Sequence, residues 1–294
     1  MFERFQTLRN APMREFTTLR LGGPADWLVT PHTAREMALA VEEAREHDIP
    51  VTVIGHGSNL LVLDGGIRGL VIRTAGGLRE CRVEGTRLVA EAGVMMGAAA
   101  NLAAENGLSG LEFASGIPGT VGGGVIMNAG AYGGEMSQTV EKVTVLTESG
   151  TAETRSAEWL AFGYRRSALQ DTGETVLQVV LRMQEENPEQ IRERMNALNR
   201  QRAEKQPLDI PSAGSTFKRP EGAFAAALID QCGLKGYTVG GARVSEKHAG
   251  FLVNRGDSAA DYLSLIQRVQ QIVLERTGIF LEPEIRILGE EREA

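Results

Sequence analysis

Apolar and polar positions follow a regular order in the first quarter of the chain. Between positions 26 and 74 the apolar runs predict a strand, a helix, a strand, a loop and a strand. The helix is expected after Pro31, because Thr33 and Glu36 have the spacing of a capping box. Apolar residues then recur at helical spacing, at Met37, Ala40, Val41 and Ala44. This segment therefore predicts a small α/β unit.

Strand patterns dominate the middle of the chain. Alternating apolar positions predict one hairpin around Gly85, another around Gly150 and a further strand at 175–183. The sequence GAAANLAAENG predicts a helix that ends at Gly107. The segment from about 75 to 188 therefore reads as α+β.

The last third begins with a charged helix over 188–205. The stretch PLDIPSAGSTFKRP follows it, and its three prolines are typical of an irregular entrance to another domain. Beyond it, the pattern predicts a helix at 222–233, short strands at 237–244 and 249–254, a helix at 258–277 capped by Ser258 and Asp261, and a strand at 280–288. The fold class is therefore α+β, with units at 1–74, 75–188 and 189–294.

Composition and charge narrow the classes of function. The 294 residues are 42% hydrophobic and 23% charged, which is ordinary for a folded protein able to bury a full core. The formal net charge is −7 and the basic residues do not cluster, which argues against a nucleic-acid partner. No apolar segment resembles a signal or a membrane span, so we expect a cytoplasmic protein.

Cysteine and histidine are sparse. The two cysteines are far apart in sequence, and the four histidines are scattered, so neither a disulfide framework nor a metal site is indicated. No obligate protein partner is evident in the sequence.

An uncharged glycine-rich stretch, GIPGTVGGGVIMNAGAYGG, occupies positions 116–134 and contains eight glycines. Its polar and glycine positions make it too interrupted for a membrane span, and its Val, Ile and Met residues are unlike a flexible linker. Residues without a Cβ let backbone N–H groups approach phosphate oxygens. The stretch therefore indicates an anion cradle.

A second glycine loop, GHGSN at 55–59, follows a predicted buried strand. Neither loop has the G-x-G-x-x-G spacing, because Leu60 and Met127 stand where the third glycine belongs, and no Gly-Lys pair forms a P-loop. Two cradles suit a diphosphate, to which Ser58 and Asn59 could add side-chain donors. Taken alone, GSN is also compatible with an ordinary turn.

Six segments in order resemble one enzyme family. The segments IGHGSNLLV, FASGIPGTVGGGVIMNAGAYGGE, YRRS, SAGSTFKRP, LIDQCGLKG and LEPEIRILG resemble the UDP-N-acetylenolpyruvoylglucosamine reductase family, over about positions 16–289. The short interval between YRRS and SAGSTFKRP is similar to members that lack an extra tyrosine-bearing loop. The resemblance implies an FAD-binding fold of the vanillyl-alcohol oxidase and para-cresol methylhydroxylase type. On this basis 1–74 and 75–188 are two FAD-binding subdomains and 189–294 binds a UDP-sugar.

The resemblance also implies cofactors and the residues that hold them. FAD is expected to bind non-covalently, with NADPH as co-substrate and UDP-N-acetylglucosamine enolpyruvate as the small-molecule substrate. The expected FAD-binding residues are Gly55, His56, Gly57, Ser58, Asn59, Leu60, Gly116, Ile117, Pro118, Gly119, Thr120, Gly122, Gly123, Asn128, Ala129 and Gly130.

Three positions match the family's catalytic residues. Ser215 matches the proton donor to the α-carbon, while the flavin supplies hydride to the β-carbon of the enolpyruvyl group. Arg165 matches the arginine that contacts the carboxylate, and its planar fork suits that contact. Glu284 matches the third position, either as a protonated donor or as an ionised partner of Arg165. Without the resemblance, these residues read as a turn serine, a surface arginine and an ion-pair glutamate.

Five basic residues are candidates for the UDP diphosphate: Lys218, Arg219, Lys235, Arg243 and Lys247. A mixed, solvated surface explains each of them equally well. Two other functions stay open for the whole chain. One is an FAD-dependent oxidase or dehydrogenase of the same fold, and the other is a non-catalytic UDP-sugar-binding protein.

Overall fold

The computed structural model describes residues 1–292, and the chain divides into two compact units. The first unit contains residues 1–8, 27–56 and 69–202. The second unit contains residues 9–26 and 57–68, and the chain from 203 onward.

The α/β pattern predicted near the N-terminus is confirmed. Strands β1 (Thr7–Pro12), β2 (Pro24–Val29), β5 (Ile67–Arg73) and β3 (Val51–Ile54) form a sheet in that order, and helix α1 (Ala34–Glu46) lies between β2 and β3 in the chain. Thr33 caps α1 by accepting the N–H of Glu36 at 3.1 Å. The Glu36 carboxylate instead accepts the N–H of His32 at 2.7 Å, so only half of the predicted capping box forms.

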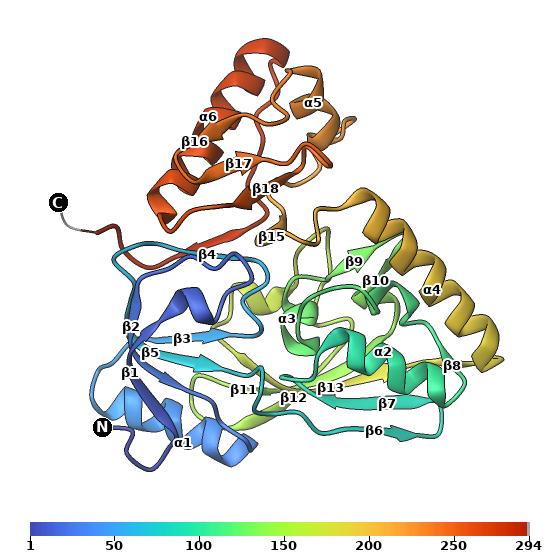
Figure 1. Ribbon diagram of the computed structural model, residues 1–294. Helices are drawn as coiled ribbons and strands as arrows, with labels where there is room; N and C mark the ends of the chain where they lie inside the picture. The colour runs from blue at the N-terminus through green and yellow to red at the C-terminus, as the bar shows by residue number, and fades with distance from the viewer. Residues whose placement is uncertain (293–294) are drawn as a thin grey trace. The chain divides into compact units, whose positions relative to one another are not determined.

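A five-stranded antiparallel sheet lies in the first unit (Figure 1). Its strands are β12 (Ala152–Ser156), β11 (Val140–Leu146), β13 (Thr175–Arg182), β7 (Arg87–Glu91) and β6 (Cys81–Glu84), in that order. Both predicted hairpins are confirmed, and their turns contain Gly85 and Gly150 at φ of 59° and 85°. The predicted helix is confirmed as α2 (Met96–Glu105), which ends two residues before the predicted end at Gly107.

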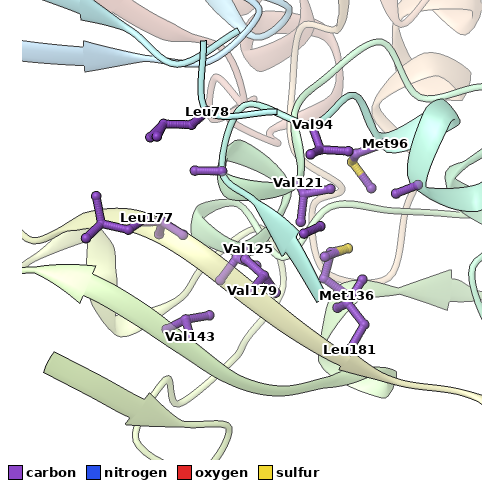
Figure 2. Packing of buried hydrophobic residues seen from close by; sticks show 14 of the residues in the cluster. Leu78, Val94, Met96, Val121, Val125, Met136, Val143, Leu177, Val179 and Leu181 are labelled. Atoms are coloured by element: carbon purple, nitrogen blue, oxygen red, sulfur yellow. The ribbon is translucent and has the colours of Figure 1, made fainter. Parts of the chain in front are cut away.

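A short helix inside the glycine stretch, α3 (Val121–Ile126), was not predicted. Glycine lowers helix stability by about 1 kcal/mol per residue relative to alanine, so the local residue pattern does not predict a helix here. Tertiary packing offsets this cost, because Val121 and Val125 are buried in the core of the first unit, where Figure 2 shows Val121 near Val94 and Met96 and Val125 near Val179.

The second unit has its own core. Strands β15 (Ser212–Ser215), β18 (Phe251–Asn254), β17 (Ala242–Val244) and β16 (Thr238–Val239) form an antiparallel sheet in that order. Helices α5 (Ala225–Gln231) and α6 (Ala259–Thr277) lie on one side of it (Figure 1). Their buried side chains pack in one cluster with those of the sheet, including Leu228, Ile229, Leu265, Ile266 and Val269.

Within residues 1–292, the remaining elements are one long helix, several short strands and four 3₁₀ turns. The remaining helix is α4 (Pro188–Lys205); the short strands are β4 (Leu60–Val62), β8 (Leu108–Ser109), β9 (Gly130–Ala131), β10 (Gly134–Glu135), β14 (Gln184–Glu185) and β19 (Arg286–Leu288); and 3₁₀ turns occupy Met13–Glu15, Glu112–Ala114, Met136–Gln138 and Ala168–Gln170. The closing strand predicted over 280–288 therefore forms only at its end, where β19 pairs in parallel with β4.

Candidate active site

The two glycine-rich loops meet inside the first unit. A Cβ added at Gly55 would lie 2.5 Å from Oγ1 of Thr120, a distance that real Cβ atoms do not tolerate. Thr120 is buried, and its Oγ1 accepts the N–H of Gly123 at 3.3 Å. The backbone at Gly55 is therefore held directly against the start of α3.

The glycines of α3 differ in what surrounds them. A Cβ at Gly122 would lie 2.8 Å from Cβ of Ala92, so this glycine is required by packing within the protein. A Cβ at Gly123 would meet only Thr120 Oγ1, at 3.4 Å. The N–H of Gly123 is engaged by Thr120, but the half-buried Gly123 leaves open space at its Cα for a ligand, whereas the buried Gly122 does not.

The predicted cofactor residues near these glycines have mixed surroundings. Ile117, Gly119 and Ala129 are half-buried and Pro118 is exposed. Gly116 lies against the last turns of α4, where an added Cβ would be 2.7 Å from Oδ1 of Asn199. Gly130 is packed more tightly, because its added Cβ would lie 2.6 Å from the carbonyl oxygen of Gly134.

His56 follows Gly55 and is half-buried. Burial lowers its pKa, and the positive charge of Arg73 lowers it further. The imidazole is therefore neutral at pH 7, and it offers this loop a ring N–H donor without a charge.

The second half of the GHGSN loop lies in the second unit, where it is tied to the C-terminal segment. A Cβ at Gly57 would lie 2.2 Å from the carbonyl oxygen of Phe16, and φ is 72°, so the fold itself requires this glycine. Asn59 donates its Nδ2 to the carbonyl oxygen of Glu284 at 3.1 Å, and the N–H of Arg286 donates to Asn59 at 2.9 Å. The Asn59 side chain therefore supports the segment that carries Glu284. Ser58 and Leu60 beside it are half-buried.

Ser215 and Glu284 belong to neighbouring segments of the second unit. The N–H of Glu284 donates to the carbonyl oxygen of Thr216 at 2.8 Å, and the N–H of Lys218 donates to that of Glu282 at 2.8 Å. The predicted irregular entrance at 207–220 thus contains strand β15, which ends at Ser215.

Strand register fixes the direction in which Ser215 faces. Thr216 turns toward the helices, because its buried Oγ1 accepts the N–H of Leu252, and the carbonyl oxygen of Leu252 in turn accepts the Tyr262 hydroxyl at 3.0 Å. Successive side chains of a strand alternate between faces, so the half-buried Ser215 lies on the opposite face, level with Phe251. Gly214, at φ of 77°, has nothing within 4 Å of an added Cβ.

Arg165 lies in the first unit on a loop with a constrained backbone. Its φ is 55°, its Nη2 donates to the carbonyl oxygen of Gly130 at 3.1 Å, and its guanidinium lies 5.3 Å from the centre of the Tyr164 ring. Two side chains hold the loop: Asn128 donates to the carbonyl oxygen of Gly163 at 3.0 Å, and Ser167 donates to that of Ile126 at 2.9 Å.

Asn128, a predicted cofactor residue, is therefore engaged within the protein. Its Oδ1 also accepts the N–H of Ser137 at 2.9 Å, and the side chain is buried. Its amide thus positions Arg165 by linking the glycine stretch to the loop after Gly163. Sequence reasoning had no signal for this link, because the two segments are 35 residues apart.

A pocket of about 220 Å³ opens in the second unit. Its lining includes Arg243 and Lys247, which were predicted from the sequence, and Arg255, which was not; the other lining residues are Pro207, Asp209, Ile210, Ser245, Glu246 and Val253. Arg243 pairs opposite Val253, and Val253 alternates with the helix-facing Leu252. The pocket therefore opens on the face of the sheet that carries Ser215.

The other three predicted substrate residues do not line this pocket. Lys218 forms an ion pair with Glu282 at 2.5 Å, and Lys235 forms one with Asp230 at 2.7 Å. Arg219 lies 4.5 Å from the centre of the Phe224 ring. Arg243 also has an ion-pair partner, Glu246.

Residues 1–292 contain neither a membrane-spanning helix nor a cluster of metal ligands. Within that range no helix combines the length and apolar character needed to cross a membrane. The same residues contain no group of three or more His, Cys, Asp or Glu side chains that could hold a metal ion.

The α+β fold and the close approach of the two glycine loops define a dinucleotide-binding protein, and sequence comparison identifies the nucleotide class. Residues 25–156 match the FAD binding domain family, and residues 206–288 match the C-terminal domain of UDP-N-acetylenolpyruvoylglucosamine reductase. The predicted fold class, an FAD-binding domain followed by a C-terminal α+β domain, is confirmed.

The relatives are similar over almost their whole length. UDP-N-acetylenolpyruvoylglucosamine reductases of Caldanaerobacter subterraneus and Clostridium botulinum are 48% and 49% identical, covering 96% and 97% of this chain and 93% of each relative. The crystal structure of the reductase from Thermus caldophilus has a TM-score of 0.84 at 40% identity, covering 97% of this chain and 99% of that one. The chain belongs to the UDP-N-acetylenolpyruvoylglucosamine reductase family, as its motifs predicted.

Proposed function

We propose that this protein uses FAD and NADPH to reduce the enolpyruvyl group of UDP-N-acetylglucosamine enolpyruvate, which yields UDP-N-acetylmuramate for peptidoglycan synthesis. The observation that carries the proposal is identity of 47% to 49%, over nearly the full chain, to relatives named for this reductase activity. We also propose a cytoplasmic location and the three-part division at 1–74, 75–188 and 189–294.

The glycine loops of the first unit fit FAD. Gly55 is packed so closely against Thr120 that a side chain is excluded, while Gly123 leaves open space at its Cα beside them. Backbone N–H groups of glycine loops hold a diphosphate without a cluster of basic side chains, and the loop at Gly55 and His56 would supply them here, because Thr120 already accepts the N–H of Gly123. Gly55, His56, Thr120 and Gly123 would therefore hold the cofactor, and Arg165 would lie beside it.

When bound, FAD takes hydride from NADPH and supplies hydride to the β-carbon of the enolpyruvyl double bond. Negative charge then develops at the α-carbon and the adjoining carboxylate, and the protein must stabilise it. Arg165 is suited to bind that carboxylate through its planar guanidinium, which Asn128 and Ser167 orient through the loop that they hold.

Ser215 would donate the proton that the α-carbon requires. A carbanion beside a carboxylate is a far stronger base than an alkoxide, so a serine hydroxyl is an adequate acid for it. Glu284 lies on the segment bonded to Thr216, the residue after Ser215. Glu284 would either donate to the developing enolate or orient a neighbouring cation.

The pocket with Arg243, Lys247 and Arg255 would bind the UDP diphosphate. Three cationic side chains line it on the Ser215 face of the sheet, although Arg243 shares its charge with Glu246. The Nζ of Lys247 donates to the carbonyl oxygen of Ala203 at 2.6 Å, which fixes its position. Arginine and lysine at such a site recognise phosphate oxygens directly.

Anaerobic titration of the purified protein tests the proposed function. The sample should be yellow, NADPH should bleach it, and UDP-N-acetylglucosamine enolpyruvate should restore the colour with one product formed per flavin. Reoxidation by oxygen but not by the enolpyruvyl substrate would indicate an oxidase. A colourless protein that binds UDP-sugars without turnover would indicate a binding module.

Replacing Arg165 with lysine should separate substrate recognition from cofactor retention. Lysine keeps the charge but loses the bidentate fork, so we expect kcat/KM for the enolpyruvyl substrate to fall about 5–10-fold, as for the loss of one hydrogen bond. FAD content per chain should stay at the wild-type value. Arg166→Lys is the matched control, because Arg166 is exposed and pairs with Asp171. Loss of FAD with unchanged kcat/KM per flavin would contradict the assignment.

A further inference from the structure

Arg202 is a half-buried arginine near the end of α4, and the mechanism above does not use it. Among residues 1–292 the structure gives its guanidinium neither an ion pair nor a hydrogen bond. The chain has 38 acidic residues against 31 basic ones, so acids to pair with it are plentiful. A cation held partly out of water without a partner is costly, which points to an anion supplied from outside the chain.

The stem of Arg202 is packed against the glycine stretch. A Cβ added at Gly116 would lie 2.9 Å from Cδ of Arg202 and 2.7 Å from Oδ1 of Asn199. The Ser115 hydroxyl also donates to that Oδ1 at 3.2 Å. The last turns of α4 are therefore fixed on the segment proposed to hold the flavin dinucleotide, and the arginine stem has little freedom.

A second arginine on the same helix shows what a structural role requires. Arg194 forms ion pairs with Glu186 at 2.6 Å and with Glu112 at 2.7 Å, and it donates to the Ser109 hydroxyl. Arg194 therefore anchors α4 to the first unit. Arg202 lies about 12 Å further along the helix axis and has no such carboxylates.

The environment of Arg202 favours an anion over water alone. Burial lowers its pKa, and the neighbouring Tyr132 hydroxyl opposes this shift, yet a guanidinium stays charged in any protein. Arg202 is itself only half-buried, so part of its side chain is accessible to a ligand. A planar fork of donors in such a place matches two oxygens of a phosphate or carboxylate.

We propose that Arg202 is an anion receptor that binds phosphate or carboxylate oxygens beside the glycine stretch. The names of the possible ligands rest on the proposed function: the anion belongs either to the FAD diphosphate or to an incoming nucleotide, NADPH or the UDP-sugar. Its binding adds a fixed cationic contact to a site that otherwise relies on backbone N–H groups.

Direct binding measurements on Arg202→Gln and Arg202→Lys test this. Arg200→Gln is the matched control, because Arg200 is exposed on the same helix and the charge change is identical. FAD affinity is measured by flavin fluorescence on reconstitution of the apoprotein. Affinities for NADP⁺ and for UDP-N-acetylglucosamine enolpyruvate are measured by the shift of the oxidised flavin spectrum in the holoenzyme.

We expect Arg202→Gln to weaken at least one of these affinities about tenfold or more, as for the loss of a charge-assisted hydrogen bond, with Arg202→Lys in between. A change confined to FAD identifies the flavin diphosphate, and a change in NADP⁺ or UDP-sugar with FAD retained identifies that nucleotide. All three affinities within twofold of Arg200→Gln would overturn the proposal, as would a fall in melting temperature with unchanged affinities.

Failure of the proposed function gives a different result. Wild-type protein that binds FAD and NADP⁺ but not the enolpyruvyl substrate would contradict the proposed function. In that case the dissociation constants of Arg202→Gln for FAD and NADP⁺, compared with those of wild type, still decide the role of Arg202. If Arg202→Gln does not fold, the comparison of Arg202→Lys with Arg200→Lys decides it.

Discussion

Ser215→Ala should stop substrate reduction while leaving flavin reduction intact. Loss of a positioned proton donor typically costs between about 100-fold and 10,000-fold, so we expect the rate at which the enolpyruvyl substrate reoxidises the reduced flavin to fall within that range. Reduction of the flavin by NADPH needs no proton from Ser215 and should remain within about twofold of wild type. Stopped-flow absorbance of each half-reaction, measured separately under anaerobic conditions, distinguishes the two effects.

Ser212→Ala is the control for this variant. Ser212 is half-buried on the same strand and pairs opposite Val253, as Ser215 pairs opposite Phe251. Its replacement should leave both half-reactions within about twofold, because no proton transfer is assigned to it. If Ser215→Ala slowed both half-reactions equally, the serine would have a structural role and another group would have to supply the proton.

Local patterns were sufficient to predict most elements of the fold. The hairpins at Gly85 and Gly150 and the capped helix α6 depend on contacts within a few residues, and all three are confirmed. Ser258 caps α6 by accepting the N–H of Asp261 at 3.2 Å, as its spacing predicted. Elements of this kind can be predicted because turn chemistry and side-chain periodicity specify them directly.

Elements that depend on distant partners were missed. Helix α3 forms from a sequence with three consecutive glycines because Ala92 and Met96 pack against it. Strand β15 forms in a proline-bounded stretch because it pairs with β18, about 40 residues later. These distant partners cannot be identified from the neighbouring residues in the sequence. In both places long-range packing overrides the local secondary-structure propensity.

In the candidate site, too, local features were predicted and contacts between distant segments were missed. The glycine content of the loops at 55–59 and 116–134 predicted that they hold one diphosphate together. The structure agrees with their being close, because Gly55 lies against Thr120. Residue types did not predict that Asn59 holds the carbonyl oxygen of Glu284, 225 residues away, or that Asn128 holds the loop of Arg165. Both asparagines read as possible ligand donors, but a side-chain amide supports distant backbone equally well. Arg202 reads as a surface charge until its packing against Gly116 is known.

Gly123→Ala should weaken FAD binding without weakening the apoprotein. The protein offers an added methyl group only Thr120 Oγ1, at 3.4 Å, and alanine is favoured over glycine in a helix by about 1 kcal/mol. The apoprotein should therefore unfold at the wild-type temperature or slightly above it. A methyl group between the backbone and the cofactor costs about 1–3 kcal/mol by overpacking, so the FAD dissociation constant should rise about 5–150-fold.

Gly122→Ala provides the opposite case on the same turn of α3. Its added methyl group would lie 2.8 Å from Cβ of Ala92 and 3.0 Å from the Ala92 carbonyl oxygen, so the apoprotein itself should lose about 1–3 kcal/mol of stability. Thermal unfolding of both apoproteins, together with FAD titration, separates the two effects. If Gly123→Ala bound FAD as tightly as wild type, the open space at the Gly123 Cα would not face the cofactor. Gly55 and Thr120 alone would then have to account for the cradle in the first unit.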